Sequence, residues 1–476
     1  MQISSVLSVK FLFLFFAGCC LSLILGAQEL PADLMAQLDR LKINPRHVGV
    51  VIQKVSSVSP IVALNNQTSY EPASVIKIVT AYSSLSILGP DYTWLTSIKG
   101  HFDESGTTIG DVVVEAQGDP FLTLEEWIGL WRKLYLLGVH NINGNVLIDN
   151  NRYQIDYPDP DIFDHQGDRV YNLIPYPLTI DFDRLAINIT PVNKTLQLST
   201  NYKWKNINLI NNLISEDLPC QKNPEKNVVV TTSHQQEQTM ISVSGRWPIS
   251  CGVGQLSRRI LPNQAIIEQT IRQTWQELGG SFSGKVLFNQ KHEELPLLVS
   301  HESLPLFMLI PLMDKYSNNV IARMLYLNTG NTDATKKTSY QQSEAKVMQF
   351  LQDKGINIKG LTLKNGSGLS REARITPDFL NNLLQTIWRD PLGHEVVTSF
   401  PLIGSEGTLR QIEVDSAENK KMYLKTGTLK EVKSIAGFVQ TKKGDWYSIV
   451  CLINDSNAQN GSAWIQSLLD WLYLTQ

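Results

Sequence analysis

Strand-like sequence lies at both ends of this 476-residue chain, and a long segment of different character separates them. Near the start, residues 47–55 and 59–67 are predicted to be two strands, and residues 71–90 follow as an apolar helix. Near the end, residues 434–455 are typical of a hairpin with a Lys-Gly-Asp turn, and a final apolar-faced helix covers 461–476. The pattern predicts an α/β (α+β) domain, with one sheet whose strands come from both ends of the chain and are flanked by helices.

The segment between these ends is predicted to be a mainly-β insertion. Short β-like runs, broken by Gly, Asn, Asp and Pro, fill much of residues 96–296, and helical pieces at 124–138 and 263–280 interrupt them. A chain of 476 residues is too long for one ordinary hydrophobic core. We therefore expect residues 28–95 and 297–476 to form one domain, with the insertion divided into two subdomains.

The first 27 residues have the pattern of an export signal. Lys10 precedes an unbroken apolar run over residues 11–25, and Gly26 and Ala27 then lead into a polar segment. The run is short for a membrane span, so we expect residues 1–27 to be a signal peptide that is cleaved after Ala27. An uncleaved anchor and a lipoprotein-type signal at Cys19 stay open as alternatives, and either would add a weak membrane association.

Export changes the interpretation of the cysteines. Cys220 and Cys251 lie in polar, turn-like contexts that suit a disulfide in an oxidising compartment, whereas Cys451 lies in a strand-like run and is expected to be a buried free thiol. The cysteine spacing has no zinc pattern. A net charge of −3 gives no electrostatic signature of nucleic-acid binding. We therefore expect no metal, no cofactor and no nucleic-acid partner.

A Ser-x-x-Lys motif opens the predicted helix over residues 71–90. Ser74 and Lys77 share one helix face, and a neutral lysine there could take the serine proton, as nucleophilic catalysis requires. The alternative is an ordinary helix start, because a chain of this size holds roughly one such motif by chance. A second copy, Ser343 and Lys346, lies in a polar helix and is interpreted as surface.

A Ser-x-Asn motif follows an apolar segment and leads into another predicted helix. Ser317 and Asn319 could project their side chains into a cleft. The alternative is simple capping of the helix by Ser317 or Asn318, and a second Ser-x-Asn occurs over residues 199–201.

A Lys-Thr-Gly-Thr motif lies in a strand-like run just before the C-terminal hairpin. Gly427 would let another backbone or a ligand approach the strand closely. Lys425, Thr426 and Thr428 could then bind a carboxylate. The alternative is an edge strand that carries a solubilising charge.

The order of the three motifs is more specific than any one of them. S-x-x-K, then S-x-N, then K-T-G is the order found in penicillin-binding proteins and class A β-lactamases. With segments such as "PASVIKIVTA", "NGSGLSREARITP" and "LKTGTLKEVKSIAGF", the chain resembles the low-molecular-mass class C penicillin-binding proteins, the D-alanyl-D-alanine carboxypeptidase/endopeptidase family. The resemblance implies a penicillin-binding-protein/β-lactamase-like domain, an antiparallel sheet flanked by helices, with two extra domains inserted between the first two motifs.

The resemblance also implies a role for each residue of the first two motifs. Ser74 would be the acylated nucleophile, and Lys77 would deprotonate it. Ser317 would relay a proton to the leaving group, and Asn319 would bond the substrate amide and help to hold Lys77.

The third motif would bind the end of the substrate. Lys425, Thr426 and Thr428 match the groups that bind a terminal carboxylate in the family, and the backbone N–H groups of Ser74 and Thr428 would form an oxyanion hole. The family usually has Asp where this chain has Asn365, and we expect a structural role at that position.

The implied activity is serine-type D-Ala-D-Ala carboxypeptidase and endopeptidase action in the periplasm. Peptidoglycan would be the partner and β-lactam antibiotics would acylate Ser74, while the oligomeric state stays open. A serine β-lactamase on the same scaffold is one rival, although no E-x-x-L-N run supplies the class A glutamate. A catalytically silent peptidoglycan-binding protein is another, and an α/β-hydrolase would need a G-x-S-x-G motif that the chain lacks.

Overall fold

The structure is a computed structural model that describes residues 29–156, 159–202, 204, 207–235, 238–333, 335–410, 412 and 421–476. The expected signal peptide over residues 1–27 lies outside this part of the chain. Within the described residues, no helix has both the length and the apolar character needed to cross a membrane.

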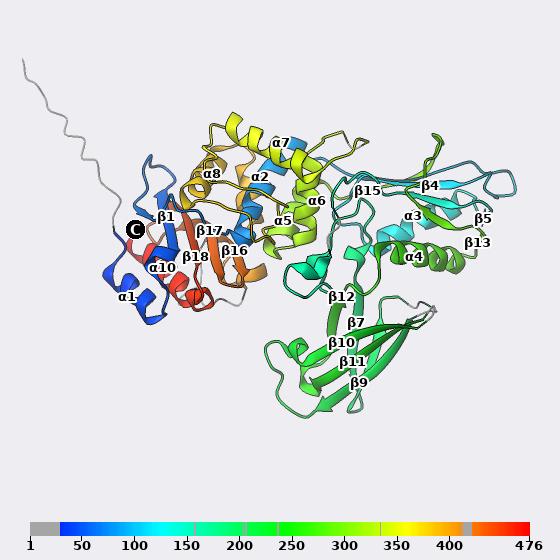
Figure 1. Ribbon diagram of the computed structural model, residues 1–476, viewed down its shortest axis with the longest axis horizontal. Helices are drawn as coiled ribbons and strands as arrows, with labels where there is room; N and C mark the ends of the chain where they lie inside the picture. The colour runs from blue at the N-terminus through cyan, green and yellow to red at the C-terminus, as the bar shows by residue number, and fades with distance from the viewer. Residues whose placement is uncertain are drawn as a thin grey trace, which may run out of the picture.

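Five antiparallel strands form a central sheet in the order β16-β17-β18-β1-β2. The strands are β16 (Met422–Leu429), β17 (Val432–Gln440), β18 (Trp446–Asn454), β1 (Val48–Lys54) and β2 (Val62–Leu64). β1 lies between β18 and β2, with Val51 opposite Val450. The sheet is therefore assembled from both ends of the chain, which confirms the fold that the sequence predicted (Figure 1).

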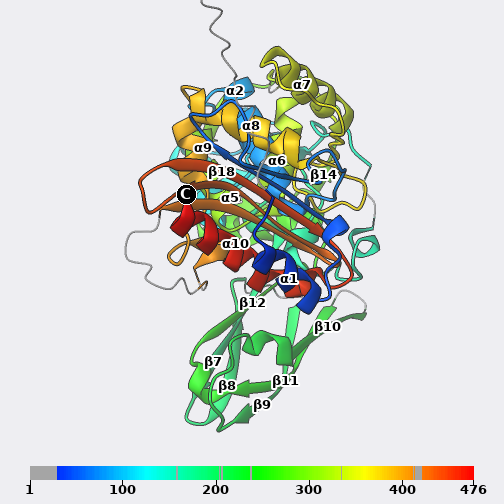
Figure 2. The same ribbon diagram turned by 90° about the vertical axis from the view of Figure 1, so that its left-hand side faces the viewer.

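Helices cover both faces of the central sheet (Figure 2). On one face, α1 (Ala32–Arg40) packs against α10 (Gly461–Thr475), and the indole of Trp464 donates a hydrogen bond to Leu34 O. The helices on the other face are α2 (Lys77–Leu88), α5 (Leu306–Lys315), α6 (Asn319–Thr329), α7 (Tyr340–Asp353), α8 (Pro377–Arg389) and α9 (Gly393–Ser399).

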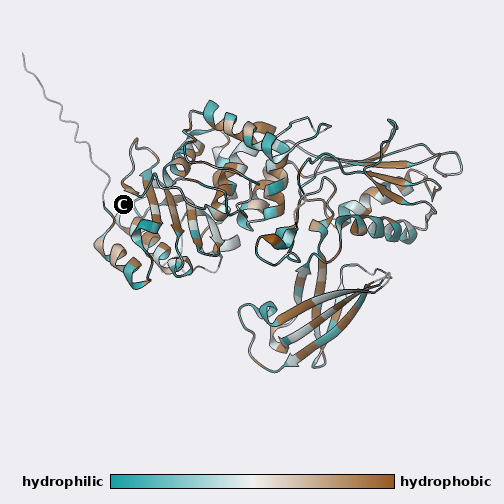
Figure 3. Ribbon diagram, in the orientation of Figure 1, coloured by the Kyte–Doolittle hydropathy of each residue, from teal (hydrophilic) through white to brown (hydrophobic). Residues whose placement is uncertain are grey.

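The strands of the central sheet are apolar because both of their faces are buried. Successive side chains of a strand point to opposite faces, so Cys451 joins the core beside α1 and α10, whereas Val450 joins the core of the second group of helices. Figure 3 shows apolar residues along these strands. A strand that is buried on both faces gives a continuous hydrophobic run in the sequence rather than an alternating one.

The first part of the insertion is a sheet with two helices packed on it. The sheet has the order β14-β6-β4-β3-β15, and its core includes Trp127, Trp131 and Trp275 from α3 (Leu124–Leu136) and α4 (Asn263–Glu277). The strands are β3 (Leu95–Lys99), β4 (Val112–Ala116), β6 (Val146–Asp149), β14 (Val286–Phe288) and β15 (Leu297–Glu302).

This sheet extends beyond the borders expected for the insertion. β15, which the expected border at residue 296 assigned to the C-terminal part, pairs with β3, and Glu302 lies opposite Leu95. The sheet is also a mixed one, because β6 runs parallel to both β4 and β14. The sheet spans residues 95 to 302, and α3 and α4 lie where the sequence predicted helical pieces.

The second part of the insertion contains two three-stranded sheets around a separate core that includes Ile187, Ile241 and Trp247. One sheet has the order β10-β11-β9 and the other has the order β12-β7-β8. Their strands are β7 (Leu185–Val192), β8 (Thr195–Thr200), β9 (Ile207–Glu216), β10 (Val228–Gln235), β11 (Gln238–Pro248) and β12 (Gly254–Arg258). This β subdomain projects away from the central sheet (Figure 1).

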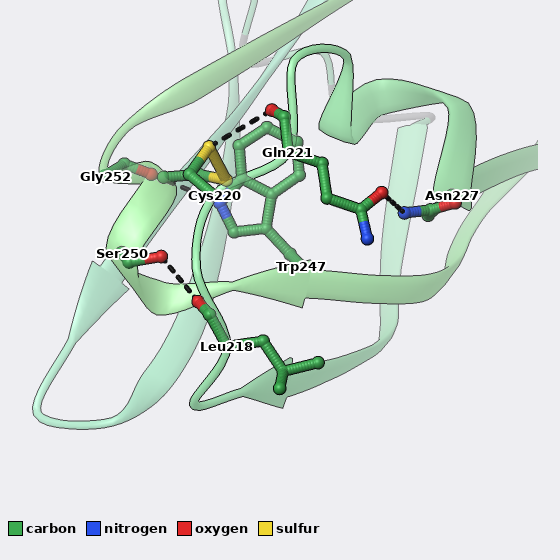
Figure 4. Close-up of a disulfide and its surroundings, with 8 residues drawn as sticks. Leu218, Cys220, Gln221, Asn227, Trp247, Ser250 and Gly252 are labelled. Atoms are coloured by element: carbon green, nitrogen blue, oxygen red, sulfur yellow. Dashed lines mark hydrogen bonds between the residues drawn. A yellow bond between two sulfur atoms is a disulfide. The ribbon is translucent and has the colours of Figure 1, made fainter.

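A disulfide joins Cys220 and Cys251 at one end of the β subdomain (Figure 4). It connects the segment after β9 to the turn after β11. Beside it, Ser250 Oγ donates a hydrogen bond of 2.6 Å to Leu218 O, and Trp247 Nε1 donates one of 3.2 Å to Gly252 O. The remaining described cysteine, Cys451, is a buried free thiol in β18.

Candidate active site

Ser74 lies in a short 3₁₀ turn, Ala73–Ile76, that leads directly into α2. Lys77 is the first residue of α2, and its Nζ lies 3.0 Å from Ser74 Oγ. Ala73, just before the serine, has a left-handed backbone with φ of 49°. Such strain in a non-glycine residue persists only where the surrounding structure enforces it, and it is typical of functional sites.

The amino group of Lys77 is surrounded by acceptors but shielded from water. The side chain is fully buried, and Nζ donates to Asn319 Oδ1 at 2.7 Å and to Ser367 O at 2.6 Å. Burial, followed by the positive charge of Lys425, lowers the pKa of Lys77 well below its usual value. A neutral amine has two N–H groups and one lone pair. The two oxygen acceptors take both N–H groups, so the lone pair is left to face Ser74.

Ser317 and Asn319 lie where α5 ends and α6 begins. Asn318 is the N-cap of α6, and its side chain accepts hydrogen bonds from the amides of Val320 and Ile321. Helix capping, the alternative considered from the sequence, is therefore the role of Asn318 and not of Ser317. Ser317 adopts a left-handed backbone with φ of 54°. Capping by Asn318 leaves the side chains on either side of it available to the site.

Lys425 lies in β16, which is a strand, as the sequence predicted, and forms one edge of the central sheet. It is fully buried, and Nζ donates to Ser317 Oγ at 3.0 Å and to Thr426 O at 2.9 Å. Thr426 Oγ1 lies 2.8 Å from Thr408 Oγ1, and the exposed Thr428 accepts a hydrogen bond of 3.2 Å from Lys433 Nζ. The structure thus places the second lysine beside the second serine.

Gly427 allows β16 to approach the serine turn. A Cβ atom at this position would lie 2.8 Å from Ser74 N and would collide with Ser434 Oγ. Ser434 Oγ is itself fixed, because it donates a hydrogen bond of 2.8 Å to Pro72 O. The close approach that the sequence suggested is therefore between two backbones, one carrying Ser74 and the other carrying the Lys-Thr-Gly motif.

A loop after α7 contributes a contact that sequence reasoning missed. The carbonyl of Ser367 accepts from Lys77, and Asn365 Oδ1 accepts from both the amide and the hydroxyl of Ser367. Asn365 Nδ2 closes the loop by donating to Leu369 O at 2.9 Å. Asn365 has a structural role in this arrangement. The only sequence indication of this loop was the "NGSGLS" segment. The contact itself could not be predicted, because it is made by a backbone carbonyl, which every residue has.

The second copies of the short motifs do not form sites. Lys346 is exposed, as interpreted from the sequence, but Ser343 is buried in α7, so the surface interpretation is wrong for the serine. Its hydroxyl donates to Ser339 O at 2.9 Å and serves to anchor the helix. The second Ser-x-Asn lies at the end of β8 in the β subdomain.

The arrangement supports acyl transfer chemistry. It combines a serine hydroxyl, a buried amine that can accept the serine proton, and a second serine beside a second lysine. No group of three or more His, Cys, Asp and Glu side chains in the described part of the chain could hold a metal ion.

Comparison with known proteins identifies the family and relatives of this chain. The model of the D-Ala-D-Ala carboxypeptidase 3 (S13) family matches residues 30–473. The D-alanyl-D-alanine carboxypeptidase DacB of Haemophilus influenzae is 27% identical over 426 residues, which cover 86% of this chain and 85% of that protein. The D-alanyl-D-alanine carboxypeptidase of Actinomadura sp. is 23% identical over 457 residues, covering 91% and 82% of the two chains.

A solved structure shares the fold. Penicillin binding protein 4 (dacB) from Haemophilus influenzae is 23% identical, and the alignment covers 93% of this chain and all of that one, with a TM-score of 0.75. The same protein solved with a β-lactam gives a TM-score of 0.72. Because the family model extends over nearly all of the described residues, the chain belongs to the D-Ala-D-Ala carboxypeptidase 3 (S13) family.

Proposed function

We propose that this chain is a serine-type D-alanyl-D-alanine carboxypeptidase and endopeptidase that forms an acyl-enzyme on Ser74. The observation that carries the proposal is the contact between Ser74 Oγ and the fully buried Nζ of Lys77. Family membership supports the reaction class, and the geometry supports the assignment of roles.

Acylation begins when Ser74 Oγ attacks the carbonyl carbon between two D-alanine residues and Lys77 takes the hydroxyl proton. The carbonyl oxygen becomes an oxyanion, which the backbone N–H groups of Ser74 and Thr428 would bind, and each such donor is worth about 10²–10³ in rate. Ser317 would relay the proton that Lys77 took to the departing amine as the carbon–nitrogen bond breaks. Water then hydrolyses the ester and regenerates Ser74.

The substrate class follows from the same groups. Lys425, Thr426 and Thr428 offer a cation and two hydroxyls to a terminal carboxylate, and Asn319 offers an amide to the peptide backbone. Peptidoglycan stem peptides carry such an end, and release of the terminal D-alanine is carboxypeptidase action. When the leaving amine belongs to a cross-linking residue, the same steps are endopeptidase action. The expected export signal would place the enzyme in the periplasm.

β-Lactams would acylate the same serine. The complex of the Haemophilus influenzae protein with a β-lactam supports this inference. Two alternatives differ from the proposal in the fate of the acyl-enzyme. A serine β-lactamase would form it and hydrolyse it quickly, whereas a catalytically silent binding protein would not form it.

Measurement of the intact mass of the mature protein before and after benzylpenicillin distinguishes these three functions. The proposal expects a stable increase of one ligand mass in the wild type and none in Ser74→Ala. A rapid return to the unmodified mass, with hydrolysed drug in solution, would favour the β-lactamase. No adduct in the folded wild type would remove the catalytic assignment.

A further inference from the structure

A short turn outside the three motifs touches the strand that carries the third motif. The turn is the 3₁₀ segment Gly407–Leu409, and Thr408 Oγ1 lies 2.8 Å from Thr426 Oγ1 in β16. Thr408 is exposed, whereas Leu409 next to it is fully buried in the core beside α1 and α10. The leucine therefore anchors the turn in the domain, and the threonine meets the motif.

Backbone pairing holds the segment before this turn against β16. Leu424 N donates a hydrogen bond of 3.0 Å to Pro401 O. Ile403 N donates one of 3.1 Å to Met422 O, so the segment runs antiparallel to the start of the strand. Two residues beyond Leu424, the hydroxyl of Thr426 meets the hydroxyl of the turn.

The turn is also fixed to the end of α5. Glu406 Oε1 forms an ion pair of 2.7 Å with Lys315 Nζ, and its Oε2 accepts a hydrogen bond of 3.1 Å from Leu402 N. Gly407 has a left-handed backbone with φ of 48°, and a Cβ atom there would collide with Lys315 O. Lys315 lies two residues before Ser317. The turn is therefore held against the elements of both the second and the third motif.

Both threonines of the third motif need a free proton if they are to bind a carboxylate, because a carboxylate only accepts hydrogen bonds and a hydroxyl has one proton. Lys433 Nζ donates to Thr428 Oγ1, so the proton of Thr428 is free. The proton of Thr426 is free only if Thr408 donates to it. A hydrogen bond to a charged acceptor is roughly twice as strong as one between neutral groups, so a bound carboxylate favours this direction.

We propose that Thr408 is a positioning residue whose hydroxyl donates to Thr426, so that Thr426 is held in place with its proton directed to the terminal carboxylate of the substrate. The inference rests on the proposed function for the role of Thr426. It assigns to a residue outside the three motifs part of the preference for substrates that end in a free carboxylate.

Thr408→Val tests the proposal, because it removes the hydroxyl of an exposed residue and keeps its branched shape. We would measure kcat and KM for two thioester substrates with the same acyl group. The leaving group carries a free carboxylate in one and the methyl ester of that carboxylate in the other. We expect kcat/KM to fall by about 3- to 10-fold for the free acid, the effect of one hydrogen bond, and to stay unchanged for the methyl ester. An equal loss for both substrates, or no loss, would overturn the proposal.

Two further variants serve as controls. Thr408→Ser keeps the hydroxyl and should restore the preference for the free acid. A serine variant as impaired as Thr408→Val would contradict the proposal, because the methyl group and not the hydroxyl would then matter. Thr386→Val removes a comparable exposed hydroxyl, which donates a hydrogen bond of 2.9 Å to Asn382 O within α8. It should leave both substrates unaffected.

A double variant shows whether Thr408 acts through Thr426. In the Thr426→Val background, the hydroxyl of Thr408 has lost its partner, so adding Thr408→Val should cause no further loss for the free acid. A further loss as large as in the wild-type background would mean that Thr408 binds the carboxylate by itself, which would overturn the positioning role.

Binding measurements give the same comparison without turnover. Titration calorimetry of Ser74→Ala with the free-acid thioester should show affinity that is about 3- to 10-fold weaker when Thr408→Val is added. The affinity for the methyl ester should not change. Equal affinity for the free acid with and without Thr408→Val would contradict the proposal. This result is independent of whether benzylpenicillin acylates Ser74, so the inference and the proposed function can fail separately.

Discussion

Lys77 Nζ lies 3.0 Å from Ser74 Oγ, and its other two contacts are the side-chain oxygen of Asn319 and the backbone oxygen of Ser367. Three groups from distant parts of the chain therefore converge on one buried nitrogen. Both oxygens are acceptors only, so they orient the neutral amine as well as hold it. The nitrogen is prepared to receive a proton from one direction, that of Ser74.

Lys77→Arg should slow acylation strongly while leaving the fold intact. A guanidinium can still donate hydrogen bonds, but it stays protonated and so cannot act as a base. We expect the rate of acylation by benzylpenicillin to fall by about 10³-fold, within the range of general base catalysis. Stopped-flow kinetics and intact mass would measure it. Retained reversible binding of the substrate would show that the base, and not the pocket, was lost. Near-normal acylation would mean that another group deprotonates Ser74.

The acylation rate should depend on pH with a bell shape. Lys77 accepts the Ser74 proton only when it is itself unprotonated, so the rate should rise as pH increases through its lowered pKa. The rate should fall again above about 8, where Lys425 loses its charge. Second-order rate constants for benzylpenicillin between about pH 5 and pH 9 would give both limbs. If the acylation rate instead fell as the pH rose through the acid range, Lys77 could not be the base.

Gly427→Ala should separate β16 from the serine turn. The added Cβ would lie 2.8 Å from Ser74 N, so the strand or the turn must shift. A displacement of about 1 Å at a reacting group costs roughly 100-fold in rate, and we expect a loss of that size in acylation.

Gly129→Ala is the control, because this glycine lies within α3 with open space around its Cβ position. It should keep full activity and gain about 0.5–1 kcal/mol of stability. Wild-type acylation in Gly427→Ala would show that the close approach is not required.

Removal of the disulfide should destabilise the β subdomain and leave the active site working. The bond closes a loop with a sequence separation of 31 residues, for which the chain-entropy model gives about 3–4 kcal/mol. Calorimetry of Cys220→Ala/Cys251→Ala should show an earlier transition, and benzylpenicillin should still acylate the protein at the wild-type rate. Cys451→Ala, in the core of the central sheet, should instead lower the transition of that domain. A loss of acylation in the double variant would mean that the β subdomain supports the site.

The sequence was informative where chemistry depends on side-chain type and periodicity. The continuous apolar runs at both ends predicted a sheet shared between them, and the contexts of Ser74, Ser317 and Lys425 indicated a turn into a helix, a loop and an edge strand. All three contexts are present in the structure.

The sequence was less informative where an interaction is made by the backbone or depends on long-range pairing. Ser367 contributes a carbonyl, which every residue possesses. β15 is a short strand whose partner, β3, lies about 200 residues earlier in the chain, so no local signal could place it in the inserted sheet.

The position of β1 within the central sheet determines when this domain can fold during synthesis of the chain. β1 leaves the ribosome early, but its neighbour β18 is made nearly 400 residues later, which takes about 20–80 seconds at ordinary rates of translation. Until then the sheet lacks β18, its middle strand. Without β18, the strand β16, which carries Lys425, cannot be held next to Ser74. The nascent chain would thus remain unfolded in this domain, a state compatible with passage through a translocation channel. The nucleophile would become active only after the last strand has arrived.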